Sequence, residues 1–454
     1  AVGLTRKMLK ANPELPLLIN HALQTAGDLA MQCDNAVDLE RLLTVVVFGD
    51  YQLQSPTSYV HRSSTSLVFD CHDLRMHNGK HEPCVLKMMS DFDAFKRELY
   101  GRQRLASSTH AVVPLLSAAM CGDDHLLGVR TSIELRCFKP VTISKQAVIN
   151  ESETETETET GTETDTKTEA ATVTPTAKTA TELELELGSG QEQAHVLMSR
   201  YPFALCMRKA GRNLNTVIES EQLASEPLSL LQGIATKIGE CVASLHADNI
   251  VHGDVKPRNF VRWGRHGNDF RSIDFDMTFR VLQHNHNATN PSSLQQLLSD
   301  HHAPATKIIA TSAFVSPELL SWALETVQSG SANMSIPDKQ ILGGYGIDIW
   351  SFGVTLFGMV AGRPLLSNSY DEASVDCQNR LLNWDGLTAN EVAEIEIRHG
   401  KYTSVPLIHL LQWVLSPCAY KRPLSMKEVL QHEFFTNIRA DDVDVVDGVV
   451  VVGG

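Results

Sequence analysis

The chain has 454 residues, 43% of them hydrophobic, and a formal net charge of −15. Much of that charge is local, because residues 151–192 hold eleven Glu, one Asp and two Lys, a net of −10 that leaves about −5 for the remainder. This distribution does not favour nucleic-acid binding. Nine cysteines without a CxxC pair indicate neither a disulfide framework nor a zinc site, and they favour a reducing, cytoplasmic or nucleocytoplasmic compartment.

The chain begins AVGLTRKMLKANPELP, with neither an initiator Met nor a continuous apolar segment, which indicates a fragment rather than a signal-bearing N-terminus. The longest apolar run, 347–362, contains Asp348 and is shorter than the ~20 residues that a membrane span requires. We therefore expect a buried core helix there, and no membrane span.

Residues 1–43 have Leu and Ala at helical spacing. Within them, TAGDLAMQCDNAVDLERLL resembles the closing half of an ankyrin repeat. Two interpretations stay open: the end of an ankyrin-type interaction region, or a plain amphipathic extension that packs on the following domain.

From residue 44 the chain changes to five short β-rich runs, which predict an antiparallel sheet broken by one helix at 91–105. Between the fourth and fifth runs, residues 151–192 alternate Thr and Glu, and their self-repulsion and few large apolar side chains predict a disordered insertion. Apolar stripes at helical spacing predict a mainly helical part after residue 214. The order predicts an α+β chain with a small lobe at 44–210, a large lobe at 211–437 and a tail at 438–454.

The most specific segment is HGDVKPRN at 252–259, followed by IDFD at 273–276. Their residue types and spacing match the catalytic loop H-R-D-x-K-P-x-N and the metal-binding loop D-F-G of protein kinases. Phosphoryl transfer needs a carboxylate at the attacking hydroxyl, oxygen ligands for Mg²⁺ and cations on the phosphates. The two segments supply all of these groups except one cation.

Further matches occur in the order that a kinase requires. VLK at 85–87 resembles the strand motif V-A-I-K, and Glu98 follows Lys87 where the helical glutamate of kinases pairs with that lysine. TSAFVSPE at 311–318 resembles T-x-x-Y-x-A-P-E, and DIWSFG at 348–353 resembles D-x-W-S-x-G. Arg422-Pro423 resembles the late arginine that pairs with the A-P-E glutamate, here Glu318. HEFF at 432–435 resembles H-P-F-F. Over about residues 50–437 the chain thus resembles a eukaryotic protein kinase domain of the Ser/Thr type. The wording of HRSSTSLVF, YPFALCMRKAGRNL and HGDVKPRNFV also resembles kinase domains attached to ankyrin repeats in some unicellular eukaryotes.

The resemblance implies a two-lobed kinase fold, ATP and Mg²⁺ as cofactors, and protein substrates as partners. Lys256 and Thr311 favour Ser/Thr over Tyr as the acceptor. The roles that it implies are catalysis by Asp254, Lys256, Lys87 and Glu98, Mg²⁺ binding by Asn259 and Asp274, and nucleotide contacts from Lys87, Val68, Ser63, Ser66, the gatekeeper Met207 and the hinge residues Lys209 and Ala210.

The chain also departs from the kinase pattern. His61, Ser63 and Ser66 replace the three glycines of the nucleotide loop. Gly253 replaces the arginine that receives an activation-segment phosphate, and Asp276 replaces the glycine of D-F-G. Arg102 replaces an apolar residue that joins the lobes. Because Gly253 cannot bind a phosphate as arginine does, we expect activity without phosphorylation of that segment. The departures leave a second function open, that of a catalytically weak or inactive pseudokinase used as a scaffold.

Overall fold

The computed structural model describes residues 45–54, 59–63, 65–74, 83–105, 110–121, 135–138, 190–264, 267–281, 313–329, 344–366, 374–436, 445–446 and 449–450. The expected extension at 1–43, most of the predicted insertion and Thr311 lie outside the described residues.

The chain divides into two compact units, the first comprising 1–90, 119–129 and 135–204 and the second 91–118, 130–134 and 205–454. The helix predicted at 91–105 is grouped with the second unit. The physical reason is its buried face, which packs against Phe275 and Thr278 of the second unit.

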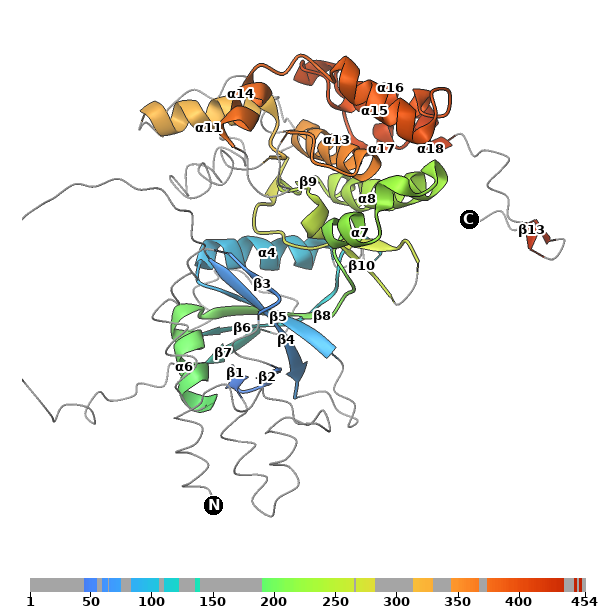
Figure 1. The fold of residues 1–454 in the computed structure, drawn as a ribbon. Helices are drawn as coiled ribbons and strands as arrows, with labels where there is room; N and C mark the ends of the chain where they lie inside the picture. Colours follow the sequence, from blue (N-terminus) through green and yellow to red (C-terminus); the bar gives the residue numbers. More distant parts are fainter. Residues whose placement is uncertain are drawn as a thin grey trace, which may run out of the picture. The chain divides into compact units, whose positions relative to one another are not determined.

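An antiparallel sheet forms most of the described first unit, as the alternating β-rich runs predict. Its strand order is β1-β2-β4-β5-β8-β6-β7, with β3 paired to β4, and Figure 1 shows the sheet as curled. The division between the units falls within β6 and β8. The strands are β1 (Val46–Val47), β2 (Tyr51–Leu53), β3 (His61–Arg62), β4 (Ser66–Asp73), β5 (Pro83–Met89), β6 (Leu115–Cys121), β7 (Leu135–Phe138) and β8 (Phe203–Arg208).

A helix that the sequence did not predict, α6 (Gly190–Arg200), precedes β8. It buries Ala194 and Leu197, and the sulfur of Met198 accepts a hydrogen bond of 3.1 Å from the backbone N–H of Phe48 beside β1. The end of the disordered insertion, predicted at residue 192, is therefore three residues too late, because residues 190–192 already belong to this helix. The apolar residues that follow 192 supply the buried face that offsets the entropy of ordering the helix.

The described second unit is mainly helical, as predicted. Two short antiparallel pairs, β9 with β12 and β10 with β11, carry the loops of the candidate site. Its elements are α4 (Phe92–Arg104), α7 (Leu214–Ser220), η4 (Leu223–Ser225), α8 (Leu228–Ala247), β9 (Ile250–Val251), η5 (Pro257–Asn259), β10 (Phe260–Arg262), β11 (Phe270–Ser272), β12 (Phe279–Arg280), α11 (Pro317–Ser329), α13 (Gly346–Ala361), α14 (Val375–Leu382), α15 (Ala389–His399), α16 (Val405–Val414), η6 (Ala419–Lys421), α17 (Met426–Val429), α18 (Glu433–Thr436), β13 (Val445–Val446) and β14 (Val449–Val450).

Helix α13 is the centre of this unit, because every residue from Ile347 to Ala361 is buried. It lies beside α8 and against α16 (Figure 1). At Gly353 an added Cβ would lie 2.7 Å from the side chain of Val414 and 2.8 Å from that of Leu415, so glycine permits the close approach of α16. The prediction of a buried core helix in this apolar run is confirmed, with the helix ending at Ala361 and the exposed Gly362 as its C-terminal cap.

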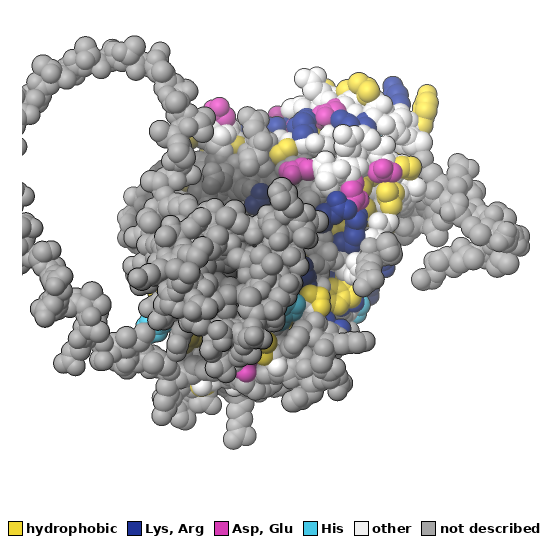
Figure 2. Space-filling model, turned by 60° about the horizontal axis from the view of Figure 1, so that its bottom comes forward, with side chains coloured by type: hydrophobic (Ala, Val, Ile, Leu, Met, Phe, Trp, Pro, Cys, Tyr) yellow, Lys and Arg dark blue, Asp and Glu magenta, His cyan; other side chains and the backbone are white. Residues whose placement is uncertain are grey.

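Among the described residues, no helix combines the length and the apolar character that crossing a membrane requires. Figure 2 shows one face of the molecule, on which the described Lys and Arg side chains are interspersed with Asp and Glu. The visible described part of that face therefore presents mixed charge rather than one large field of a single sign.

Candidate active site

The backbone of the HGD segment is held by a buried carboxylate from the central helix. Asp348 of α13 is fully buried, and its oxygens accept hydrogen bonds from the backbone N–H groups of His252 at 2.8 Å and Gly253 at 2.9 Å. Hydrogen bonds to a buried charge are among the stronger ones in proteins. This anchor fixes the chain immediately before Asp254, and the sequence motif around Asp348 did not reveal it.

A histidine extends this anchor into α8. Nε2 of His246 lies 3.0 Å from Asp348 Oδ2, while its Nδ1 accepts a hydrogen bond of 3.3 Å from the backbone N–H of Met426. Because Nδ1 accepts, the geometry fits an imidazole whose proton is on Nε2 and points at the carboxylate. Tyr345 stacks on this ring at a centroid distance of 4.1 Å, and its hydroxyl donates to the backbone oxygen of His246 at 2.9 Å.

Gly253 adopts the left-handed backbone region with φ of 78°. An added Cβ would lie 2.5 Å from the backbone oxygen of Met277, which is closer than real contacts allow. Glycine at position 253 thus permits both the left-handed conformation and the close approach of the Met277 backbone. Glycine at position 253 is therefore a backbone requirement of the catalytic loop.

Three predicted site residues meet at the catalytic loop. Asn259 Nδ2 donates to the backbone oxygen and to Oδ2 of Asp254, each at 2.8 Å, and Lys256 Nζ lies 2.7 Å from the same Oδ2. Asn259 is buried, whereas the side chains of Asp254 and Lys256 keep 17% and 28% of their surface exposed. The carboxylate is therefore fixed in direction and still open to a substrate.

Lys256 lies in the field of several carboxylates. Burial by itself lowers the pKa of this lysine, but the negative charges of Asp254, Asp274 and Asp276 outweigh that effect, so its pKa is raised. Lys256 therefore keeps its positive charge across the physiological pH range. A permanent cation beside Asp254 is suited to neutralise charge on a phosphoryl group.

The metal-binding loop follows β11, and the catalytic loop holds its first residue. The backbone N–H of Ile273 donates to the backbone oxygen of Asn259 at 2.9 Å, and His252 Nε2 lies 3.2 Å from the oxygen of Ile273. Asp274 itself has φ of 66°, an uncommon conformation for a residue with a Cβ. Such strain persists only where the surroundings hold it, and it often marks functional sites.

Asn259 and Asp274 fit the ligand chemistry of Mg²⁺. The Nδ2 group of Asn259 has two oxygen acceptors on Asp254, which settles the orientation of the amide and leaves its oxygen as an available ligand. Amide and carboxylate oxygens are the hard ligands that Mg²⁺ prefers. The two residues therefore suit the predicted metal role.

Glu98 and Arg102 form an ion pair within α4 that the sequence did not predict. Both Nε and Nη2 of Arg102 donate to Glu98 Oε1, at 3.0 and 2.9 Å, and the two side chains are only 1% and 0% exposed. The sequence predicted only that Arg102 replaces an apolar residue. The structure adds that Arg102 pairs with Glu98, the predicted catalytic glutamate.

The remaining predicted residues of the first unit lie in the turn between β3 and β4, on β4 and on β5. Val68 on β4 is the cross-strand partner of buried Lys87 on β5. Ser63 Oγ accepts from the N–H groups of Thr65 at 3.3 Å and Ser66 at 3.0 Å, and lies 2.9 Å from Ser66 Oγ. These hydroxyl and N–H groups already bond inside the hairpin, so they are less available to phosphates than a glycine loop would be.

The predicted gatekeeper and hinge residues end β8 and follow it. Met207 is buried, Ala210 is half-buried and Lys209 is exposed. The next residue, Gly211, donates its N–H to the backbone oxygen of Arg262 at 2.8 Å. This bond joins the segment to β10, which directly follows the catalytic loop.

A salt-bridge network beside the hinge had no sequence signal. Glu221 receives Arg262 through two parallel bonds of 2.8 and 2.9 Å, and it also binds Arg212. The hydrogen bond from Arg262 is the main cause that lowers the pKa of Glu221. The carboxylate thus stays ionised and ties the segment after the hinge to β10.

The predicted pairing of Arg422 with Glu318 is confirmed. Two parallel bonds, of 2.7 and 3.0 Å, join the guanidinium to the carboxylate, and the Arg422 side chain is fully buried. The guanidinium also lies 4.7 Å from the centre of the Trp350 ring on α13. The first turn of α11, which carries Glu318, is thereby fastened to the core of the second unit.

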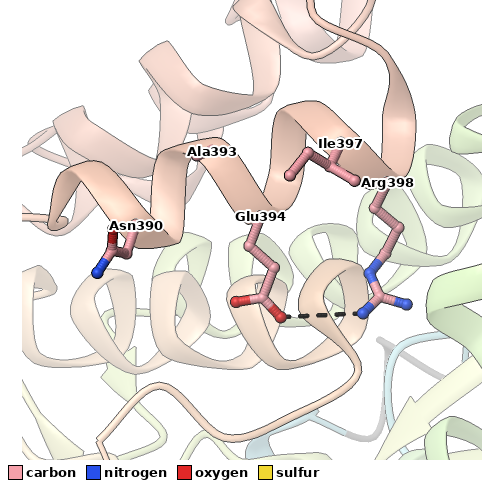
Figure 3. Close-up of a pocket in the computed structure, with 5 residues that line it drawn as sticks. All are labelled: Asn390, Ala393, Glu394, Ile397 and Arg398. Carbon is pink, nitrogen blue, oxygen red and sulfur yellow. Dashed lines mark ion pairs between the residues drawn. The ribbon is translucent and has the colours of Figure 1, made fainter.

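A surface hollow on α15 belongs to a different part of the second unit (Figure 3). It is lined by Asn390, Ala393, Glu394, Ile397 and Arg398, and Figure 3 marks the ion pair of 3.8 Å between Glu394 and Arg398. None of the predicted site residues lines this hollow, so it is not the candidate active site.

Comparisons with known proteins agree with this geometry. Residues 194–435 match the family model of the protein kinase domain. The chain is 27% identical over 215 residues to Serine/threonine-protein kinase PKH2 of Saccharomyces cerevisiae, covering 46% of this chain and 16% of that protein. It is 25% identical over 221 residues to Serine/threonine-protein kinase ksg1 of Schizosaccharomyces pombe, covering 46% and 29%. It is also 26% identical over 136 residues to the human Phosphorylase b kinase gamma catalytic chain, liver/testis isoform, covering 29% and 25%.

The matched segment thus spans less than a third of each of these relatives. The family model, however, covers more than half of the chain and includes the catalytic loop, the metal-binding loop and the Glu318–Arg422 pair. The chain therefore belongs to the protein kinase domain family.

Proposed function

We propose that this chain is an ATP-dependent protein kinase that transfers the γ-phosphate of ATP to Ser and Thr hydroxyls of protein substrates. The observation that carries the proposal is the cluster of Asp254, Lys256 and Asn259, in which the carboxylate is aimed and partly exposed and the lysine remains charged. This is the set of groups that positioning and charge stabilisation in phosphoryl transfer require. The names of the relatives, and Lys256 two residues after Asp254, support Ser and Thr as acceptors.

Asp254 orients the acceptor hydroxyl and accepts its proton as the bond to phosphorus forms. Lys256, 2.7 Å from the same carboxylate, neutralises negative charge on the transferred group. The acceptor then leaves as a phosphate ester, and the nucleotide keeps the electron pair of the broken bond. Because both cationic and anionic groups are fixed before the reaction, little reorganisation is needed during transfer.

Bound Mg²⁺ would neutralise the phosphates, and Asn259 and Asp274 are the residues that would hold it. In the same proposal Lys87 binds the phosphates and Glu98 orients that lysine. Val68, Met207, Lys209 and Ala210 would contact the adenine and ribose, and Ser63 and Ser66 would lie near the phosphates. Since the hydroxyls of both serines already bond within the β3–β4 hairpin, we expect a higher KM for ATP than a glycine loop would give.

The test is a transfer assay with labelled ATP, a generic acceptor protein and a peptide library, followed by identification of the phosphorylated residue. Asp254→Asn should lower transfer at least ~100-fold while nucleotide affinity changes little. Asp385→Asn, an exposed aspartate outside the site, is the matched control and should retain full activity. Wild-type turnover that Asp254→Asn leaves intact would refute the proposed site.

The alternative of a pseudokinase scaffold is favoured by one observation, the serine-bonded nucleotide hairpin. It predicts that the wild type transfers no phosphate to any acceptor and that Asp254→Asn retains partner binding. The compartment and an upstream ankyrin-type region remain predictions from the sequence.

A further inference from the structure

One face of α4 is turned toward the metal-binding loop. Arg97, Glu98, Gly101 and Arg102 occupy positions that share a helix face, since residues four apart lie above one another. Glu98 is 0% and Arg102 4% exposed, so two of the three ionisable groups on this face are deeply buried, whereas Arg97 is half-buried. Burying charges is costly unless they are paired and hydrogen-bonded, so this face calls for a reason beyond packing.

Arg102 pairs with the buried carboxylate of Glu98 and also contacts two residues outside α4. Besides its two bonds to Glu98, its Nη1 donates to the backbone oxygen of Val113 at 2.8 Å. Its guanidinium lies 4.9 Å from the centre of the Phe275 ring, within the range of a cation–π contact. An apolar side chain could fill this space without the cost of desolvating a charge. The arginine adds directional contacts that an apolar side chain cannot make, to Glu98, Val113 and Phe275.

Arg97 makes a second attachment one residue further along the loop. Its Nε donates to the backbone oxygen of Asp276 at 2.6 Å. Burial lowers the pKa of Arg97, against the opposing effect of Asp276 and two other carboxylates, yet an arginine stays charged. Between the two arginines, an added Cβ on Gly101 would lie 3.2 Å from Thr278 Oγ1 and 3.5 Å from Phe275 Cβ, so helix and loop are in close contact.

These attachments flank the strained residue of the site. Asp274 has φ of 66°, and its predecessor Ile273 is held by the catalytic loop through two hydrogen bonds. On its other side, Phe275 and Asp276 are the two residues that α4 contacts through Arg102 and Arg97. A left-handed aspartate needs such restraint, because the unstrained conformations are otherwise preferred.

We propose that Arg97 and Arg102 are positioning residues that hold the metal-binding loop and keep Asp274 in its metal-binding conformation. The inference rests on the proposed function, since it assigns the purpose of the restraint to Mg²⁺ binding by Asp274. Gly253 cannot receive a phosphate from the activation segment, and this clamp from α4 supplies order to the loop without one. The site is then ordered before any modification.

The test compares Arg97→Met and Arg102→Met with Arg104→Met, an exposed arginine in the last turn of the same helix. Mg²⁺ is titrated against nucleotide binding by calorimetry, and kcat, the KM of an acceptor peptide and the melting temperature are measured in parallel. Methionine keeps the length and apolar surface of the side chain but removes its donors and charge.

Release of a strained residue of this kind corresponds to roughly a 5- to 100-fold loss of the competent conformation. We therefore expect each clamp variant to need at least ~5-fold more Mg²⁺ for half-saturation and to lose kcat, with the KM of the peptide unchanged. Arg102→Lys, which keeps the charge, should recover part of the loss. Arg104→Met should behave as the wild type.

Arg97→Met removes a single hydrogen bond at a half-buried position, so it keeps the test decisive where Arg102→Met does not fold. A folded Arg97→Met whose Mg²⁺ requirement and kcat equal those of the wild type would overturn the clamp. Absence of phosphate transfer by the wild type would instead refute the proposed function, and the calorimetric titration would still test the clamp.

Discussion

The anchor beneath the catalytic loop is the part of the site whose removal can be worked out most fully. Asp348 Oδ2 accepts from His246 and from the N–H of His252, and Oδ1 accepts from the N–H of Gly253. In Asp348→Asn the better of the two amide orientations places the oxygen at the Oδ2 position and keeps two bonds. The amide NH₂ then faces the N–H of Gly253, so two donors meet in a buried place.

A buried donor without an acceptor costs about 1 to 3 kcal/mol. For a unit of this size each kcal/mol lowers the melting temperature by about 2 to 4 °C, so we expect a decrease of about 5 °C. The released N–H precedes Asp254 directly, and small misplacements of a catalytic group cost up to ~100-fold in rate. We therefore expect kcat to fall about 10- to 100-fold, with the KM for ATP changed less.

Thermal unfolding followed by circular dichroism, together with the transfer assay, measures both effects. Asp385→Asn makes the same chemical change at an exposed position and serves as the control. A variant that melts within about 1 °C of the wild type and keeps its kcat would show that Asp348 does not anchor the loop.

Three further predictions concern single contacts. Gly253→Ala should lower stability by about 1 to 3 kcal/mol in chemical unfolding, because φ of 78° and a backbone oxygen 2.5 Å from the added Cβ both oppose a side chain; unchanged stability would mean that the loop relaxes freely. Arg422→Gln leaves the partly buried Glu318 carboxylate without its two bonds and should cost about 1 to 3 kcal/mol, whereas Arg398→Gln at the surface should cost less than ~1 kcal/mol. The pKa of Glu221 is lowered in the folded chain from 4.5, so its contribution to folding stability is present above about pH 4.5 and is lost as the pH falls through the folded pKa. Glu221→Gln should therefore destabilise the fold by about 1 kcal/mol at pH 7 and by progressively less in acid. A stability difference that grows in acid would contradict this sign.

The sequence by itself determined the order of the chemistry along the chain. The catalytic loop, the metal-binding loop and the expected partners Glu318 and Arg422 follow from residue types at fixed spacing, and the apolar pattern indicated the core helix α13 and the mainly helical part after residue 214. These predictions succeed because a loop motif is contiguous in the chain and because a helix face is a local property with a fixed period.

Only the tertiary structure decided which of these segments hold one another in place. Asp348 meets His252 across 96 positions of the chain, and Arg97 meets Asp276 across 179. Arg102 carries no local mark that distinguishes a buried positioning arginine from a solvated one, and its role depends on which residues surround it. The assignment of α4 to the second unit and the helical start of α6 at Gly190 have the same origin, because both depend on apolar surface that distant residues provide. Contacts of this kind are set by packing between segments far apart in the chain, which periodicity and spacing do not encode.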